Sequence, residues 1–119
     1  VSGNKDGYDI ITNAKDRLAE YKKRCEVKGL IGIPTGIPKL DELTNGWLWG
    51  EELVVITGRT NVGKSWMAEY FATIAYNLGY KILFYSGEMS KEIIGFRFDT
   101  LNKHFSISCL LNGACTLGK

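Results

Sequence analysis

A narrow apolar stripe on an otherwise charged surface marks the first part of the chain. Between Asp9 and Lys28 the sequence contains neither proline nor glycine. Apolar side chains recur there three or four residues apart, as on one face of a helix: Ile11, Ala14, Leu18, Tyr21 and Cys25. The pattern predicts a helix from Asp9, a candidate N-cap, to Lys28. Because the rest of its surface is charged, docking on a partner and packing as an ordinary first helix are equally favoured.

Glycine and proline interrupt the segment that follows. They alternate from Gly29 to Pro38, which excludes a continuous helix and predicts a connecting loop. Pro38 suits the first turn of a short helix, which Asn45-Gly46 is expected to end. The tryptophans that come next, Trp47 and Trp49, are interpreted as packing residues, with stacking on a nucleotide base as the weaker alternative.

The second half of the chain alternates short apolar runs with helical periodicity. An apolar run over residues 53–56 precedes a predicted helix over residues 66–78, and a second apolar run covers residues 81–85. This order predicts a strand–helix–strand unit with a parallel sheet, and therefore an α/β fold. A further helix is expected from Ser90, with apolar side chains at Ile94, Phe98, Leu101 and Phe105. The tail over residues 106–119 predicts a short helix and a loop.

Residues 58–65 carry the strongest chemical signal. They read Gly-Arg-Thr-Asn-Val-Gly-Lys-Ser, a complete G-x-x-x-x-G-K-[ST] loop between the first predicted strand and its helix. The glycines allow backbone N–H groups to approach phosphates, Lys64 can reach the β- and γ-phosphates, and Ser65 can offer its hydroxyl to Mg²⁺. The predicted nucleotide-binding residues are therefore Gly58, Arg59, Thr60, Asn61, Val62, Gly63, Lys64 and Ser65.

Glu88 follows the second predicted strand, within the sequence Ser86-Gly87-Glu88-Met89-Ser90. Sites in parallel α/β sheets open at the carboxyl ends of the strands, so its carboxylate is expected to point at the γ-phosphate. Hydrolysis requires a group that orients or deprotonates the attacking water, which makes Glu88 the candidate base. The alternative is an acid that only compensates the dipole of the next helix.

Composition excludes several classes of protein. The chain has 119 residues and a formal charge of +2, and its sequence shows no basic patch typical of nucleic-acid-binding domains. Its apolar runs are too short for a signal peptide or a membrane span, so an intracellular protein is expected. The three cysteines form no C-x-x-C pair, which favours reduced thiols over a disulfide framework or a zinc site.

Three motifs, in this order, resemble the DnaB-type replicative helicases, which are ring-forming motors with a RecA-like fold. The motifs are residues 32–41, the phosphate-binding loop and residues 86–90. The resemblance implies a linker helix and the loop after it over residues 1–36, then the N-terminal half of a RecA-like ATPase domain over residues 37–119. The expected fold is thus a partial RecA-like P-loop NTPase fold, α/β with a parallel sheet, preceded by an N-terminal linker helix.

The resemblance also implies the roles of residues and partners. Lys64 and Glu88 would be catalytic, Lys64 and Ser65 would contact phosphate and Mg²⁺, and the cofactors would be ATP and Mg²⁺. Identical subunits would form a hexameric ring through the linker helix and act on single-stranded DNA, with primase or a helicase loader as further partners. The implied activity is 5′-to-3′ translocation and duplex unwinding driven by ATP hydrolysis, in the cytoplasm.

The sequence also departs from the family's pattern. Bacterial members often have Arg-Pro-Ser where Arg59-Thr60-Asn61 stands and a bulkier apolar residue in place of Gly87, which favours a phage-encoded or divergent member. The family's Mg²⁺-binding aspartate, DNA-binding loops and trans-acting arginine are not found, so a fragment inactive in unwinding is expected. A RecA-like recombinase or clock-type ATPase, and a non-catalytic nucleotide-binding or assembly module, stay open as alternatives.

Overall fold

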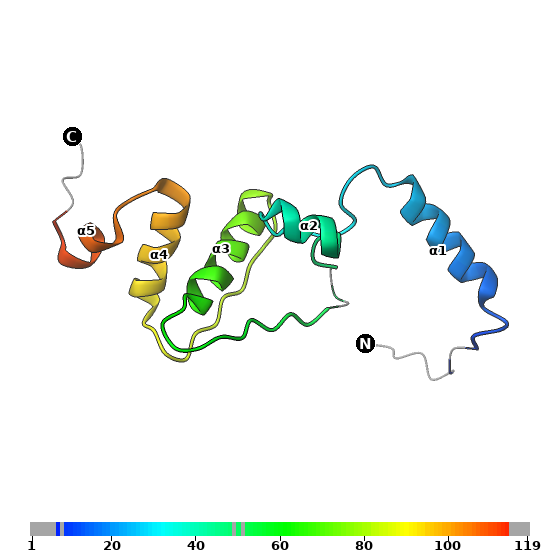
Figure 1. Cartoon of the computed structure of the whole chain (residues 1–119), viewed down its shortest axis with the longest axis horizontal. Coiled ribbons are helices and arrows are strands. Elements are labelled where there is room, and N and C mark those ends of the chain that lie inside the picture. Colours follow the sequence, from blue (N-terminus) through cyan, green and yellow to red (C-terminus); the bar gives the residue numbers. More distant parts are fainter. Residues whose placement is uncertain (1–6, 8, 49, 51, 115–119) are drawn as a thin grey trace. The chain divides into compact units, whose positions relative to one another are not determined.

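The computed structural model describes residues 7, 9–48, 50 and 52–114, and it divides into two compact units, Val1–Ile31 and Gly32–Lys119. Within these described residues the elements are helices (Figure 1): α1 (Ala14–Glu26), α2 (Pro38–Thr44), α3 (Lys64–Asn77), α4 (Lys91–Lys103) and α5 (Ile107–Asn112).

Helix α1 is the regular element of the first unit, and it starts later than its sequence pattern suggests. Asp9 closes a turn ahead of the helix: its carboxylate accepts the Ile11 N–H at 2.8 Å and the Thr12 hydroxyl at 2.6 Å. The Thr12 hydroxyl and the backbone N–H groups of Ile11 and Thr12 lower the pKa of Asp9. The N-cap position itself is Asn13. No residue of α1 is buried, and Leu18 and Tyr21 of the apolar stripe are 54% and 65% exposed.

The loop before α2 is fixed by its own polar groups. Thr35 is fully buried, its N–H donates to the Asp41 carboxylate at 2.8 Å, and its hydroxyl accepts the Ile37 N–H at 3.1 Å. The backbones of Ile33 and Trp47 form an antiparallel bridge that closes this segment around α2. Helix α2 begins at Pro38 and ends before a left-handed Asn45, as its sequence predicts.

The same loop docks on α3 through a close backbone approach. The Tyr70 hydroxyl donates to the Gly36 carbonyl at 2.9 Å, and a Cβ added at Gly36 would lie 2.7 Å from the Ile74 side chain. Beside this contact the edge of the Trp47 ring meets Phe71, with centroids 5.4 Å apart. Trp47 is therefore a packing residue, whereas Trp49 lies outside the described residues. The loop over residues 32–37 thus positions the middle of α3.

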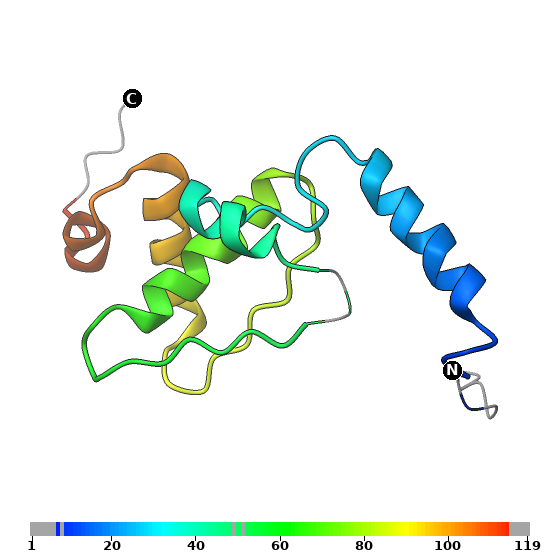
Figure 2. The same cartoon turned by 45° about the vertical axis from the view of Figure 1, so that its right-hand side comes forward.

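The two predicted strands are extended, but they pair in no β-ladder among the described residues (Figure 2). Their side chains alternate as in strands: Leu53 and Leu83 are 90% and 96% exposed, whereas Ile56 and Phe84 are partly covered. A strand requires a neighbouring backbone as well as an apolar pattern, and the described chain gives neither segment such a neighbour. The predicted parallel sheet is therefore not observed.

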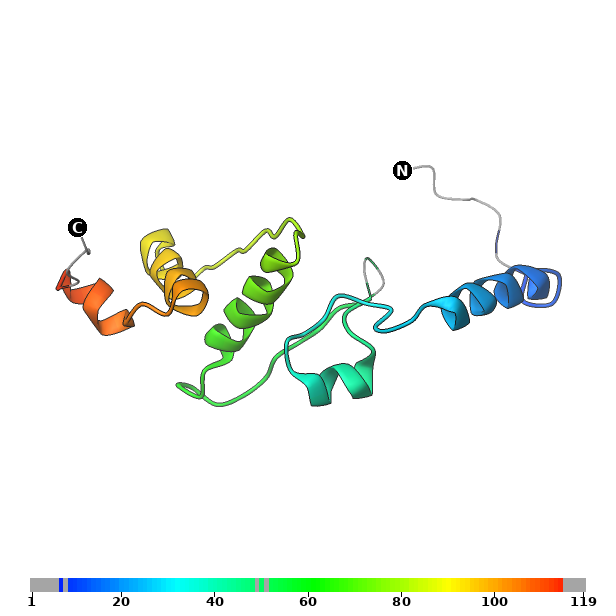
Figure 3. The same cartoon turned by 90° about the horizontal axis from the view of Figure 1, so that it is seen from above.

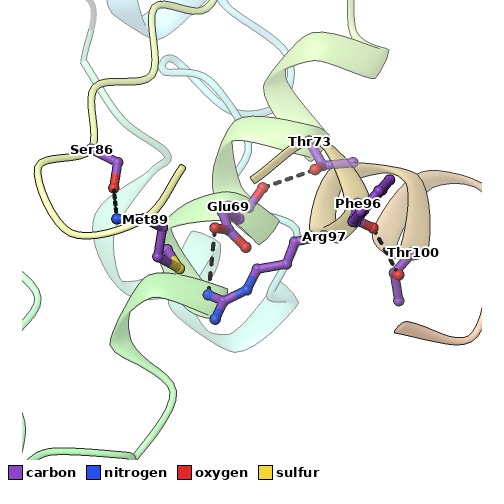
Figure 4. Close-up of polar contacts among 7 residues, drawn as sticks. All are labelled: Glu69, Thr73, Ser86, Met89, Phe96, Arg97 and Thr100. Atoms are coloured by element: carbon purple, nitrogen blue, oxygen red, sulfur yellow. Dashed lines mark hydrogen bonds and ion pairs between the residues drawn. The ribbon is translucent and has the colours of Figure 1, made fainter. Parts of the chain in front are cut away.

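Helix α3 lies between α2 and α4 in the second unit (Figure 3), and it packs against α4. The Phe84 ring meets the Phe98 ring of α4 edge-on, with centroids 5.6 Å apart. An ion pair links α4 to α3 directly: Arg97 of α4 lies beside Glu69 of α3, with 3.6 Å between Nη1 and Oε1 (Figure 4). Glu69 is fully buried, and neither of its carboxylate oxygens has a hydrogen-bond partner among the described residues. Burial raises the pKa of Glu69, and the nearby Arg97 charge opposes that rise only in part.

The C-terminal helices follow their sequence signals, except that α4 ends earlier than predicted, and the state of one cysteine also differs from the prediction. The Ser90 hydroxyl caps α4 by accepting the Ile93 N–H, but α4 ends at Lys103, so Phe105 lies beyond it and is 46% exposed. Cys109 of α5 is disulfide-bonded, so the expectation of reduced thiols is wrong at this residue, whereas Cys25 is free. Disulfide formation depends on two sulfur atoms meeting in space, which spacing along the chain does not reveal.

The close approach at Gly36 predicts a position-specific cost for a methyl group. Gly36 has a φ of +86° and no room for a Cβ, so Gly36→Ala should lower the free energy of unfolding by about 1 kcal/mol or more. Gly87 is the matched control, because a Cβ there meets nothing within 4 Å. Denaturant unfolding of both variants measures the difference, and equal stabilities would contradict this packing.

The raised pKa of Glu69 predicts a pH-dependent stability. The folded protein binds the Glu69 proton more tightly than the unfolded chain does. The stabilisation that this proton gives the folded state is therefore complete below 4.5, the ordinary pKa of a glutamate, and is lost as the pH rises through the raised pKa. The free energy of unfolding of Glu69→Gln relative to the unaltered chain should therefore increase from pH 4.5 towards neutrality.

Glu42→Gln is the control for this pH series, because Glu42 also pairs with a cation, Lys39, but at an exposed position. This substitution removes an exposed carboxylate, so it separates the effect of burial at Glu69 from the loss of one negative charge. A flat difference for Glu69→Gln over the same range would show that the Glu69 carboxyl is not desolvated in the folded protein.

Candidate nucleotide-binding site

The loop over residues 58–65 adopts a conformation that depends on its glycines. Gly63 is the N-cap of α3 with a φ of +95°, and Asn61 is also left-handed, with a φ of +61°. A Cβ at Gly58 would lie 2.8 Å from the Val62 side chain. The loop therefore turns tightly into the N-terminus of α3, where unpaired N–H groups and the helix dipole favour an anion.

Lys64 is the first residue of α3, and its side chain folds back over the loop. Its ammonium group donates to the carbonyl oxygens of Gly58 and Arg59, each at 2.8 Å. These two residues thus hold the lysine through their backbone. A phosphate oxygen is a stronger acceptor for an ammonium group than a neutral carbonyl, so a bound phosphate can compete for it.

A cavity of about 450 Å³ opens beside the start of α3. Six residues of its wall were predicted as site residues: Thr60, Asn61, Gly63, Lys64, Ser65 and Glu88. The remaining wall residues are Trp66, Met89 and Arg97. Gly58, Arg59 and Val62 belong to the loop but do not line this cavity, and Val62 is 64% exposed. Two segments that are separate in sequence, the loop and the stretch around Glu88, therefore meet at one place.

A second cavity, of about 520 Å³, adjoins the same residues. Its wall includes Lys64, Ser65, Glu88 and Met89, together with side chains of both extended segments such as Val54 and Phe84. Glu88 and the end of the phosphate-binding loop therefore line both cavities.

The position of Glu88 depends on the turn that carries it. The Ser86 hydroxyl accepts the Met89 N–H at 3.2 Å (Figure 4). Ser90 caps α4 directly afterwards. Gly87 has open space where a Cβ would stand, so no contact requires a glycine there. Glu88 is exposed, as a carboxylate that must reach a water or a ligand has to be.

Arg97 is the charged residue of the wall that sequence reasoning missed. Its guanidinium lies 4.7 Å from the centroid of the Trp66 ring and 3.6 Å from the Glu69 carboxylate. The Arg97 side chain as a whole is 20% exposed. The expected role of its helix was to cover a sheet, and an arginine nine positions after Glu88 matches no spacing motif. A weak signal for a cation was available. Trp66 and Glu69 stand three residues apart and so share one face of α3, where an aromatic ring and a carboxylate can both attract an arginine.

Oxygen groups suited to Mg²⁺ are present in the cavity. Ser65, which carries a hydroxyl, and Glu88, which carries a carboxylate, both line it. Mg²⁺ is commonly bound by few protein oxygens together with phosphates and water. The described residues contain no cluster of three or more histidine, cysteine or acidic side chains that could hold a metal alone.

No helix within the described residues combines the length and the apolar surface needed to span a bilayer.

Comparison with known proteins identifies relatives for most of the chain. The probable replicative DNA helicase of Trieres chinensis is 34% identical over 95 residues, which cover 79% of this chain and 21% of that protein. Replicative DNA helicases DnaB of Mycoplasma genitalium and Leifsonia xyli are 37% and 38% identical, over 73% and 75% of this chain and 19% of each relative. The chain thus spans about a fifth of the length of these curated relatives.

No solved structure matches the chain. The family described as the DnaB-like helicase C terminal domain matches residues 32–116, a range that begins where the second compact unit begins. The chain therefore belongs to the DnaB-like helicase C-terminal domain family.

Proposed function

We propose that the chain binds and hydrolyses ATP as part of a replicative hexameric helicase. The observation that carries the proposal is that Lys64, Ser65 and Glu88 line one cavity at the N-terminus of α3. Membership of the helicase family supports ATP as the nucleotide. In the complete protein, hydrolysis would drive 5′-to-3′ translocation on single-stranded DNA and duplex unwinding, whereas this chain alone would not unwind DNA.

The chemistry follows from the loop and the turn around Glu88. Backbone N–H groups of residues 58–65 and the α3 dipole hold the phosphates, and Lys64 exchanges its carbonyl partners for β- and γ-phosphate oxygens. Mg²⁺, when bound at Ser65, neutralises phosphate charge. Glu88 orients the attacking water and accepts its proton as the water oxygen bonds to the γ-phosphorus. The bond between that phosphorus and the β–γ bridging oxygen breaks, and ADP and phosphate are released. Electrostatic stabilisation of the transferring phosphoryl group then lowers the barrier.

The sheet, the domain division and the partners of the complete protein are proposed from family membership and from the exposed side chains of the two extended segments. Residues 53–57 and 81–85 would become strands of a RecA-like parallel sheet on pairing with further strands, since their side chains already alternate between covered and exposed. Residues 1–36 would be the linker region and residues 37–119 the first half of the ATPase domain. Single-stranded DNA, and primase or a helicase loader, would be partners of the complete protein in the cytoplasm.

Substitutions at Lys64 and Glu88 should separate binding from hydrolysis. Lys64→Ala should abolish measurable ATP binding by the chain, because it removes the cation from the loop. Glu88→Gln should preserve binding and lower ATP turnover by at least about a hundredfold in the complete protein, because an amide cannot accept the proton. Calorimetric titration and a phosphate-release assay measure the two effects. Unchanged hydrolysis by Glu88→Gln would exclude Glu88 as the base.

The exposed stripe of α1 should act in assembly of the complete protein. Leu18→Asp should shift the hexamer towards smaller species, because a charge on the stripe opposes its burial against a neighbouring subunit. Ala19→Asp is the matched control, one position away and outside the stripe. Sedimentation velocity of both variants tests the role of the stripe in assembly. Identical profiles would contradict that role.

A further inference from the structure

We propose that Arg97 is a second phosphate-binding cation of this site, which contacts the terminal phosphate of a bound nucleoside triphosphate from within the same chain. Trp66 and Glu69 are the positioning residues that hold its guanidinium at the cavity wall. The inference rests on the proposed nucleotide site and adds to it a residue and a preference for triphosphate over diphosphate.

The placement of Arg97 follows from two contacts with α3. The guanidinium lies over the Trp66 ring, 4.7 Å from its centroid, and this cation–π contact fixes one face of the group. Glu69, one helical turn further on, holds the same guanidinium at 3.6 Å. Arg97 therefore reaches from α4 across to α3 and lines the cavity beside Lys64 and Ser65.

The ion pair with Glu69 does not satisfy either partner. A charge-assisted N–H···O hydrogen bond is usually about 2.7–2.9 Å long, and the observed separation is 3.6 Å. Both oxygens of the fully buried Glu69 carboxylate are without a hydrogen-bond partner in the described part of the chain. A carboxylate placed there to build a purely structural bridge would be expected to accept the forked N–H groups of arginine at short distance. The looser geometry leaves guanidinium donors available to a ligand.

The charges around the cavity favour a highly charged anion. Lys64 and Arg97 supply two cations to its wall, and Glu88 supplies one carboxylate. A planar guanidinium can bind two oxygens of one phosphate, which makes it suited to a terminal phosphate with three free oxygens. Glu88 comes from the turn before α4 and Arg97 from α4 itself, and both line this cavity.

Affinities for Mg-ATP and Mg-ADP test the proposal in variants designed to stay folded. Removing Arg97 alone would leave the buried Glu69 charge without its partner, so Glu69→Gln is combined with Arg97→Gln and compared with Glu69→Gln alone. Loss of Arg97 in this background should weaken ATP binding by about tenfold or more and ADP binding by less than about threefold. Arg97→Lys should recover part of the ATP affinity lost in Arg97→Gln. Lysine keeps the positive charge but lacks the paired N–H donors with which a guanidinium binds two oxygens of one phosphate.

Lys103→Gln, at the far end of α4, is the control and should leave both affinities unchanged. Equal losses of ATP and ADP affinity on removal of Arg97, or no loss of either, would overturn the proposal and leave Arg97 a structural link between α3 and α4. Retention of ATP affinity by Lys64→Ala would instead overturn the nucleotide site itself, so the two failures are distinguishable.

Discussion

The packing of α4 on α3 is the constraint on which the rest of the candidate site depends. Helix α3 carries the phosphate-binding loop at its N-terminus, and α4 begins at Lys91, shortly after Glu88. Any change in the distance between the two helices would therefore separate Lys64 from Glu88. The Glu69–Arg97 ion pair joins the two helices directly, and the Phe84–Phe98 ring contact holds α4 against the extended segment before Glu88. A buried, incompletely paired carboxylate costs folding free energy, and such a cost is typical of residues retained for function.

Local signals in the sequence predicted local structure well. Pro38 and Asn45 mark the ends of α2, Ser90 caps α4, and the G-x-x-x-x-G-K-[ST] pattern indicates the turn into α3. These features depend on backbone preferences of single residues, which a sequence states directly. Glu88 and Lys64 line one cavity, while their roles with a nucleotide stay predictions.

Features that depend on distant partners were not predictable in the same way. An apolar run such as residues 53–56 indicates an extended segment, but only a neighbouring backbone makes it a strand, and none pairs with it in the described chain. Arg97 was missed because its role depends on Trp66 and Glu69, about thirty residues earlier, which come close only when α3 and α4 pack. Tertiary proximity, not residue type, made it a wall residue of the cavity.

The central claim is that a nucleoside triphosphate binds between the loop over residues 58–65 and the turn that carries Glu88. The most direct measurement is an amide chemical-shift titration of the isotope-labelled chain with Mg-ATP. The account predicts that the largest shifts fall on residues 58–65 and 86–90, with α1 unaffected. Shifts that are absent at saturating nucleotide, or that centre on α1 or α5, would contradict it.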